Sequence, residues 1–236
     1  MIIGHIGVRK GSKGVPNKNF RPIAGKPLLD WSLDQLKEHT QIDHFVISTD
    51  CTEMHAHALN KGSLDIGLRP AHLATDTASK WDVWQHTLSC IEDQYGQIDA
   101  FVDLDCTSPL RKQEDIDNAI SLFFDKKPDM VMSCCTARKN PYFNLVEPDE
   151  NGFVHLSKKL DTSIVSRQQA PIVYEHAAST YVLSPSYLKS AKFIYDGNVL
   201  PLIMPAERCI DIDDEIDFEF VEFKLEKSQK NDLTKK

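Results

Sequence analysis

Residues 2–22 read IIGHIGVRKGSKGVPNKNFRP, an apolar segment that runs directly into a basic one. The segment Ile2–Val8 has the composition of a buried strand. The segment Val8–Pro22 then places five cationic side chains among two glycines and two prolines: Arg9, Lys10, Lys13, Lys18 and Arg21. The sequence therefore predicts a first strand that ends in a flexible, strongly positive loop.

Short apolar segments and amphipathic segments alternate beyond this loop. Further strands are predicted at His44–Thr49, just before Arg69, at Asp99–Asp105, at Asp129–Cys135 and within residues 179–185 and 199–205. Helices are predicted at Pro27–His39, Thr52–Lys61, Ser79–Tyr95 and Glu114–Phe124, and from about Asp213 to a frayed, lysine-rich tail at 228–236. This alternation favours an α/β fold, with a mostly parallel sheet flanked by helices and ligands at the carboxyl ends of its strands.

The alternation stops between about residues 138 and 175. This segment contains the turn PDENG at 148–152 and has little helical periodicity. We expect it to form a hairpin-bearing insertion, at a place typical of a dimer arm or a substrate lid. Without repeats or linkers, the chain is otherwise expected to be a single domain over 1–236.

Composition limits the class of protein. The chain is 41% hydrophobic and 26% charged, as is ordinary for a globular enzyme, and its net charge of −8 argues against general binding to nucleic acid or to an anionic membrane. No apolar run approaches the ~20 residues that span a bilayer, and the N-terminus lacks signal-peptide features. Six cysteines without a C-x-x-C pair indicate reduced thiols and no structural zinc. We therefore expect a cytoplasmic protein.

The positive loop has the features of a phosphate clamp. Gly11 and Gly14 allow backbone N–H groups to approach an anion, while Arg9 and Lys18 supply charge. The loop fits neither the Walker A pattern nor the Gly-x-Gly-x-x-Gly dinucleotide pattern. The alternative is an ordinary solvated surface loop.

Four segments together resemble the CMP-sugar synthetases, which activate sialic acids and related nonulosonic acids. They are RKGSKGVPNKNFRPIAGKPLL (9–29), LRPAHLATDTAS (68–79), TSPLR (107–111) and IDIDDEIDF (210–218). The resemblance implies a Rossmann-like nucleotide-diphospho-sugar transferase fold with a small β-rich dimerisation insertion. It also implies a reaction in which CTP and a 2-keto sugar acid give a CMP-sugar and pyrophosphate, carried out by a homodimer.

The resemblance assigns the nucleotide contacts. Arg9, Ser12 and Lys18 match residues that hold the triphosphate, and Lys18 is placed to stabilise the departing pyrophosphate. The remaining expected nucleotide contacts are Gly11, Asn19, Arg69, Thr107 and Ser108. For Ser12 and Asn19 the alternative is turn formation, and for the basic residues it is surface solvation.

Two acidic pairs, Asp103/Asp105 and Asp211/Asp213, complement this positive charge. Residues i and i+2 of a strand point the same way, ~6.6 Å apart, so two carboxylates repel by ~2.5 kcal/mol at an effective dielectric of ~20 and favour a bound cation. The family resemblance makes Asp211 and Asp213 ligands of Mg²⁺, with Asp211 catalytic beside Arg9 and Lys18. The alternative for Asp213 is the N-cap of the last helix.

Asp105 departs from the family pattern, because many sialic-acid-activating members have glutamine there. We expect its carboxylate to contact a sugar hydroxyl or amide, or to help the metal. No histidine has an evident catalytic partner: His55 and His57 are two residues apart on a helix and face different ways.

The segment SRQQAPIVYEHAASTYVL (166–183) carries the expected sugar contacts, Arg167, Gln168, Tyr174 and Glu175. This segment and ARKNPYFNLVE (137–147) look closer to the legionaminic-acid branch than to the sialic-acid branch. Legionaminic acid or a derivative is therefore the expected substrate, and N-acetylneuraminate is the alternative. Arg167 could instead form an interface salt bridge, and Tyr174 could belong to the core.

Two other classes of protein stay open at this point. In a metal-dependent glycosyltransferase Asp103–Asp105 would be the Asp-x-Asp motif, but the positive first loop would then lack a triphosphate to bind. A non-enzymatic nucleotide-binding module would explain the loop but would not need Asp211 and Asp213.

Overall fold

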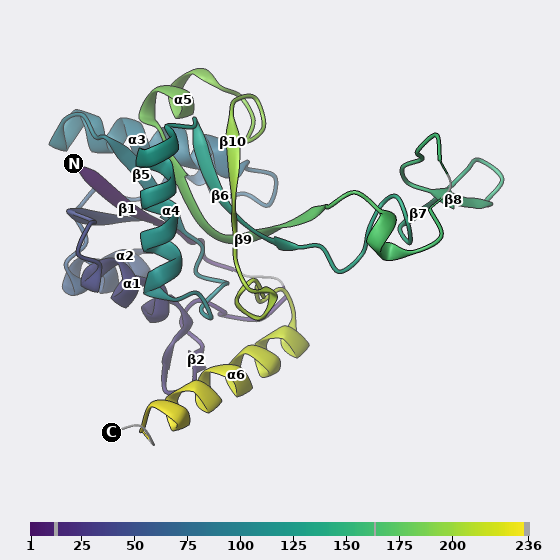
Figure 1. Cartoon of the computed structure of the whole chain (residues 1–236). Coiled ribbons are helices and arrows are strands. Elements are labelled where there is room, and N and C mark those ends of the chain that lie inside the picture. The colour runs from purple at the N-terminus through teal and green to yellow at the C-terminus, as the bar shows by residue number, and fades with distance from the viewer. Residues whose placement is uncertain (12–13, 163, 234–236) are drawn as a thin grey trace.

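A computed structural model describes residues 1–11, 14–162 and 164–233 of the chain (Figure 1). Its main sheet has the strand order β10-β6-β9-β5-β1-β4. The strands are β1 (Ile2–Gly7), β4 (His44–Ser48), β5 (Ala100–Leu104), β6 (Met130–Thr136), β9 (Tyr174–Leu183) and β10 (Val199–Ile203). Only β9 runs antiparallel to its neighbours β5 and β6 among these described strands, so the expected mostly parallel sheet is confirmed.

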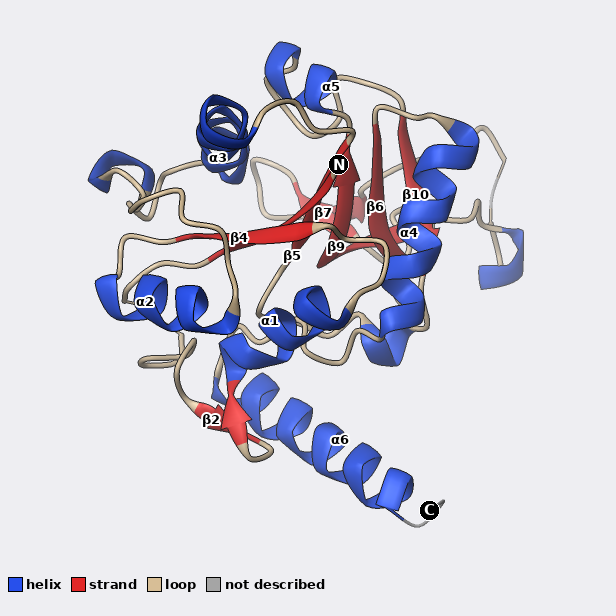
Figure 2. Ribbon diagram, turned by 90° about the vertical axis from the view of Figure 1, so that its left-hand side faces the viewer, coloured by secondary structure: helices blue, strands red, loops and turns tan. Residues whose placement is uncertain are grey.

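Helices cover both faces of the sheet (Figure 2). On one face lie α1 (Leu28–Glu38), α2 (Thr52–Lys61) and α4 (Gln113–Lys126), whose apolar residues share a core with Ile6 and Val102. On the other lie α3 (Lys80–Tyr95) and α5 (Pro185–Ser190), which pack against Ile3 and Phe101. Side chains alternate along a strand, so β1 contributes to both cores.

The last helix, α6 (Glu215–Leu233), belongs to a third apolar cluster at the lower end of the molecule (Figure 1). Its Phe218, Val221 and Leu225 pack with Val15 of the positive loop and Ile212. The same cluster includes the short β2–β3 hairpin, formed by Pro22–Ile23 and Lys26–Pro27. This packing fixes the C-terminal segment against the first loop of the chain.

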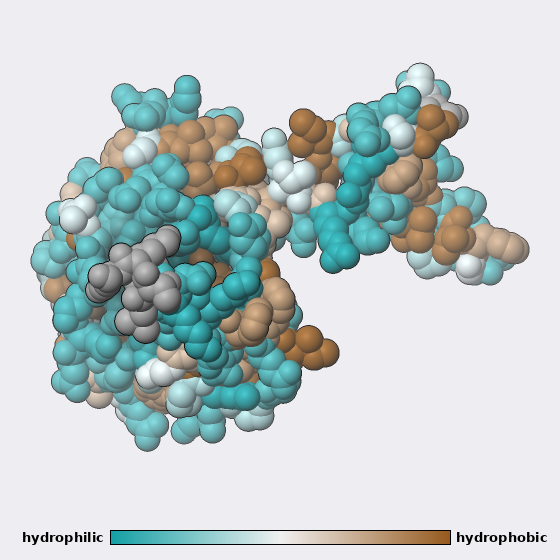
Figure 3. Space-filling model, turned by 60° about the horizontal axis from the view of Figure 1, so that its bottom comes forward, coloured by the Kyte–Doolittle hydropathy of each residue, from teal (hydrophilic) through white to brown (hydrophobic). Residues whose placement is uncertain are grey.

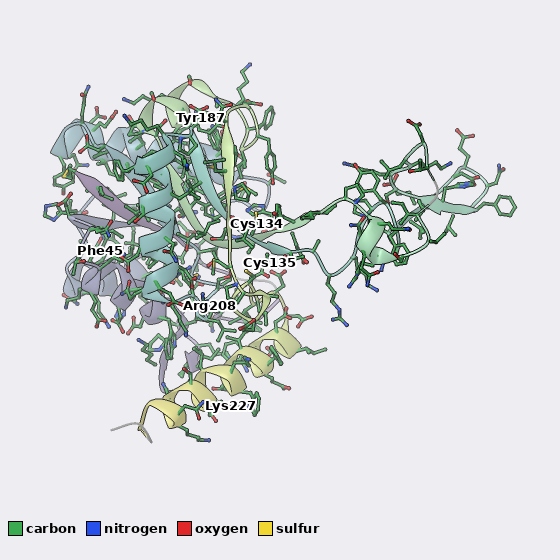
Figure 4. All side chains as sticks on the ribbon, viewed as in Figure 1. Phe45, Cys134, Cys135, Tyr187, Arg208 and Lys227 are labelled. Carbon is green, nitrogen blue, oxygen red and sulfur yellow. The ribbon has the colours of Figure 1, made fainter. Side chains whose placement is uncertain are left out.

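The expected insertion contains a hairpin of β7 (Val146–Pro148) and β8 (Val154–Leu156) and extends away from the sheet as an arm (Figure 1). We call residues 138–173 the arm. It leaves the sheet at β6, beside Cys134 and Cys135 (Figure 4). Hydrophobic side chains lie on its surface (Figure 3), and Val146 and Val154 are 53% and 63% exposed. All six cysteines lie in the described residues and are free.

Three local expectations are wrong. Only an isolated bridge between Val46 and Leu64 replaces the strand expected before Arg69, because Gly67 adopts a positive φ of 73° and Pro70 follows. The last helix begins at Glu215, two residues later than expected. It continues to Leu233, so residues 228–233 are helical rather than frayed. No helix in the described ranges combines the length and apolar character needed to cross a membrane.

Candidate active site

A cleft of about 310 Å³, which we call the β1–α3 cleft, lies at the carboxyl ends of β1 and β5. Its walls come from the end of β1, the segment before α3 and the first turns of α3. Its lining includes His5, Gly7, Arg9, Arg69, Thr75, Asp76, Ala78, Lys80, Trp84 and Asp105. A second cleft of about 560 Å³ shares Arg9 and is bordered by Gly11 and Asn19. Arg9 therefore lies between two clefts at the edge of the sheet where ligands were expected to bind.

The positive loop contacts the segment that carries Asp211 and Asp213. Lys18 Nζ donates a hydrogen bond to the carbonyl oxygen of Ile212, at 2.6 Å. A Cβ added to Gly14 would lie 1.9 Å from the carbonyl oxygen of Asp213, so only glycine permits this approach. The ammonium of Lys18 is thus bound to the backbone between Asp211 and Asp213, although the two segments are far apart in sequence.

The geometry excludes the helix-capping alternative for Asp213. Asp214 is the cap: its Oδ1 accepts a hydrogen bond from the backbone N–H of Asp217 at 3.0 Å, and Asp217 Oδ2 accepts one from the N–H of Asp214 at 3.2 Å. The exposed carboxylate of Asp213 has no such role.

Asp211 and Asp213 fit a hard cation. Burial raises the pKa of Asp211, and the nearby charges of Asp213 and Asp105 raise it further. Such uncompensated negative charge on oxygen ligands suits Mg²⁺. No group of three or more His, Cys, Asp or Glu side chains within the described residues could hold a metal ion. A metal held here therefore needs further oxygen ligands from substrate.

The TSPLR turn lies against the same segment. The carbonyl oxygen of Thr107 accepts a hydrogen bond from the N–H of Ile212 at 3.0 Å, and the Thr107 hydroxyl donates to Asp105 Oδ1 at 2.8 Å. Ser108 is fully buried, and its hydroxyl donates to the carbonyl oxygen of Ala178. Ser108 thus joins this turn to β9.

The cation between Asp103 and Asp105 is a lysine that sequence reasoning missed. Lys80 Nζ lies 2.9 Å from a carboxylate oxygen of each aspartate, and 4.5 Å from the ring centroid of Tyr181. The ammonium lowers the pKa of Asp103 and of Asp105 against the effect of burial. The available signal was a lysine at the first position of a helix predicted to follow the LRPAHLATDTAS segment.

Two histidines pair with aspartates that sequence reasoning did not identify. His5 Nδ1 lies 2.5 Å from Asp103 Oδ1 in the interior, and His57 of α2 pairs with the buried Asp30 of α1. Burial lowers the pKa of His5, and the positive charges of Arg69 and Lys80 lower it as well. His5 and Asp103 are register partners on adjacent parallel strands, a pairing that single strands do not reveal.

The other predicted nucleotide ligands are held by protein contacts. Arg9 pairs with Asp76 at the rim of the β1–α3 cleft. Arg69 is buried and donates to the hydroxyl and carbonyl of Ser48; burial lowers its pKa to about 10, so it stays charged at neutral pH. The Asn19 amide donates to the carbonyl oxygen of Arg9 at 3.1 Å and so shapes the loop. Gly11 borders the second cleft with a φ of 83°, and Ser12 lies outside the described residues.

The predicted sugar ligands lie away from the β1–α3 cleft within one chain. Arg167 and Gln168 belong to a short turn of the arm, where Arg167 donates to the carbonyl oxygen of Arg138. Tyr174 and Glu175 begin β9, and Tyr174 borders a separate hollow at the base of the arm. The structure therefore brings together the phosphate and metal residues but not these four.

Comparison with known proteins identifies relatives of the chain. The family profile described as cytidylyltransferase matches residues 3–216. The chain is 36% identical over 223 residues to the post-translational flagellin modification protein B of Campylobacter coli, and 35% identical to the CMP-N,N'-diacetyllegionaminic acid synthase of Campylobacter jejuni. Each alignment covers 94% of both proteins.

A solved structure shows the same fold. The structure of CMP:2-keto-3-deoxy-manno-octonic acid synthetase complexed with CTP superposes with a TM-score of 0.69, covering 96% of this chain and 99% of that chain. At 13% sequence identity the likeness concerns the fold alone.

Proposed function

The chain belongs to the cytidylyltransferase family, and we propose that it joins CTP to a nonulosonic acid, releasing pyrophosphate. The observation that carries this proposal is the contact of Lys18 with the Asp211–Asp213 segment. An ammonium and two carboxylates at one place supply what a triphosphate and its metal require together.

Each residue has a role that follows from its chemistry. Lys18 and Arg9 neutralise the phosphates, and Lys18 stabilises the negative charge of the departing pyrophosphate as the anomeric hydroxyl attacks the α-phosphorus. Asp211 and Asp213 would hold Mg²⁺, which supplies charge neutralisation and orientation of the triphosphate when bound. Ser12 and Gly11 offer backbone and hydroxyl donors to the phosphates, and Asn19 holds the loop in shape.

Asp105 and Lys80 also line the β1–α3 cleft and offer polar groups to the sugar. Legionaminic acid or a derivative is the proposed sugar, because a CMP-N,N'-diacetyllegionaminic acid synthase matches nearly the whole chain. The alternative is N-acetylneuraminate: an N-acylneuraminate cytidylyltransferase of Escherichia coli is 30% identical over 92% of this chain and 50% of that protein. Either product would serve cell-surface glycan synthesis from cytoplasmic CTP.

A homodimer through the arm would complete the site. Val146, Pro148, Val154 and Leu156 share one face of the β7–β8 hairpin by register, and that apolar face is exposed. An isolated two-stranded hairpin is marginal in water, so a covering partner is favoured. In a dimer the arm's Arg167 and Gln168 could reach a sugar bound to the second copy.

The glycosyltransferase alternative is disfavoured by Lys80. Its ammonium already contacts both carboxylates of the Asp103–Asp105 pair. An Asp-x-Asp motif that binds a metal would need these oxygens.

The test is pyrophosphate release from CTP and Mg²⁺ with a panel of nonulosonic acids. We expect release only when a sugar acid is present, and fastest with legionaminic acid derivatives. Release without any sugar acid, or turnover only of a nucleotide-sugar donor, would refute the proposed reaction. Faster turnover of N-acetylneuraminate would move the assignment to the sialic-acid branch.

A further inference from the structure

Two polar atoms of the β1–α3 cleft lack hydrogen-bond partners among the described residues. They are Nε2 of His5 and Nε1 of Trp84. Both side chains line the cleft and are almost fully buried. A buried polar atom without a partner costs free energy, so such atoms mark a place where a ligand supplies the missing bond.

The contact with Asp103 determines what His5 offers. The Asp103 carboxylate is ionised because the ammonium of Lys80 lies beside it, so His5 Nδ1 must donate its hydrogen to this oxygen. Burial, together with the charges of Arg69 and Lys80, outweighs the opposite effect of Asp103 and lowers the pKa of His5, so the imidazole is neutral at pH 7. Nε2 is therefore left with a lone pair and acts as an acceptor.

The same cleft presents donors. The indole Nε1–H of Trp84 can only donate. The Arg69 guanidinium uses two of its N–H groups on Ser48 and has others. It lies near the histidine: a Cβ at Gly7 would be 3.2 Å from His5 Cε1 and 3.5 Å from Arg69 Nη2.

One acceptor and two donors match the pairing edge of cytosine. Cytosine presents an amine donor at N4 and acceptors at N3 and O2, whereas uracil presents an acceptor at O4 and a donor at N3. Arg9, the proposed triphosphate ligand, stands at the rim of this cleft, so the base of a nucleotide held by Arg9 can enter it. The missing side chain at Gly7 keeps that end of the cleft open.

We propose that His5 and Trp84 determine the choice of nucleotide base, with His5 Nε2 accepting a hydrogen bond from the N4 amine of CTP and Trp84 donating to the cytosine ring. The proposal rests on the proposed function, in which CTP is the nucleotide substrate. UTP is rejected because its O4 would face the histidine lone pair without a hydrogen between them.

The test compares two variants that separate the two hydrogen bonds of His5, the one donated to Asp103 and the one accepted at Nε2. In His5→Asn the amide nitrogen takes the place of Nδ1 and still donates to Asp103, but the acceptor at Nε2 is lost. In His5→Gln the amide oxygen reaches the position of Nε2 and restores an acceptor. His57→Asn is the matched control, because His57 also pairs with an aspartate but lies outside the cleft.

Equilibrium binding of CTP and UTP is measured for each protein, together with kcat/KM for both nucleotides. We expect the preference for CTP to fall at least about tenfold in His5→Asn. His5→Gln and His57→Asn should keep most of it. Thermal melting identifies any variant that fails to fold.

The outcomes separate the two proposals. An unchanged CTP preference in folded His5→Asn would overturn the role of His5 while leaving the proposed function intact. Loss of preference in His5→Gln to the same degree as in His5→Asn would also overturn it. A wild-type protein that prefers CTP in binding but turns over no sugar acid would refute the proposed function alone. Wild-type protein that does not distinguish CTP from UTP would refute the base-recognition proposal.

Discussion

Lys18 links two segments that are 193 residues apart, because its ammonium bonds to the carbonyl between Asp211 and Asp213. Removal of this charge should act on chemistry more than on folding, since Val15 and Phe218 pack independently of it.

We predict that Lys18→Ala and Asp211→Asn each lower kcat/KM for CTP by at least about a hundredfold. Far-ultraviolet circular dichroism should remain unchanged. Lys37→Ala, on the exposed end of α1, is the control and should keep wild-type rates. Near-normal rates in either site variant would contradict the assigned roles.

A second residue-scale prediction concerns pH. Because the pKa of His5 is lowered by burial, the unfolded chain binds a proton below pH 6.5 that the folded chain does not. The free energy of unfolding therefore rises with pH below about 6.5, by up to ~1.4 kcal/mol per pH unit for this group. His39, His86 and His176 have lowered pKa values for the same reason and add to the slope.

Urea denaturation at pH 5, 6 and 7 measures this slope. His5→Asn should reduce this slope by at most the contribution of one proton. An identical slope in wild type and His5→Asn would show that His5 is protonated equally in both states.

The roles of site residues were predictable from sequence where the residues belong to a recognisable motif. Their contacts were not predictable where those contacts depend on the register of neighbouring strands. The juxtaposition of Lys18 and Asp211 was expected from linked motifs and is present. The partners of Asp103 were not expected, because His5 and Lys80 come from a neighbouring strand and from a helix start. Only the structure shows that Asp213 does not cap α6, because the next residue, Asp214, forms the capping hydrogen bond.

At the scale of elements, the contact between the positive loop and the segment before α6 decides the geometry of the site. Gly14 makes this contact possible, because any Cβ there would overlap the carbonyl oxygen of Asp213. Two elements that are separate in sequence must therefore approach at backbone distance.

We predict that Gly14→Ala separates the loop from Asp213 and weakens CTP binding in the presence of Mg²⁺ by about tenfold or more. Calorimetric titration measures the binding. Gly62→Ala, at the left-handed C-cap of α2, is the control: it should cost about 1 kcal/mol of stability and leave CTP affinity unchanged. Equal affinities in Gly14→Ala and wild type would mean that the contact does not serve nucleotide binding.

Most helices and strands were predictable because the spacing of their apolar residues matches either the helical period or the strand period. The boundaries of α2 follow directly from Thr52 and Gly62, and α3 begins where Ser79 caps it. The strand expected before Arg69 failed because the turn-forming Gly67 and Pro70 outweigh a short apolar run. The length of α6 was underestimated, because residues 228–233 are mostly polar and carry no apolar periodicity. In this part of the helix the Gln229 amide instead donates a hydrogen bond to the carbonyl oxygen of Ala24.

At the scale of the molecule, the predicted sugar ligands Arg167 and Gln168 lie on the arm, away from the predicted nucleotide ligands of the same chain. The place and hairpin of the arm were predictable from the turn PDENG and the broken alternation. The surroundings of Arg167 were not predictable from sequence, because they depend on the partner that packs against the arm.

We predict a homodimer in solution, with twice the chain mass of 26.7 kDa by light scattering. Replacing both Val146 and Val154 by Asp should give a folded monomer with much reduced turnover, since the hairpin's exposed apolar face is removed. Phe124→Ser, an exposed aromatic of α4, is the control and should stay dimeric. A monomeric wild-type protein would refute the assembly.

The most direct test of the whole account is a crystal structure with CTP and Mn²⁺ in place of Mg²⁺, with anomalous scattering used to locate the metal. We predict a manganese peak on the carboxylates of Asp211 and Asp213, a triphosphate in contact with Lys18, and cytosine beside His5. A nucleotide bound away from both Lys18 and Asp211 would contradict the account.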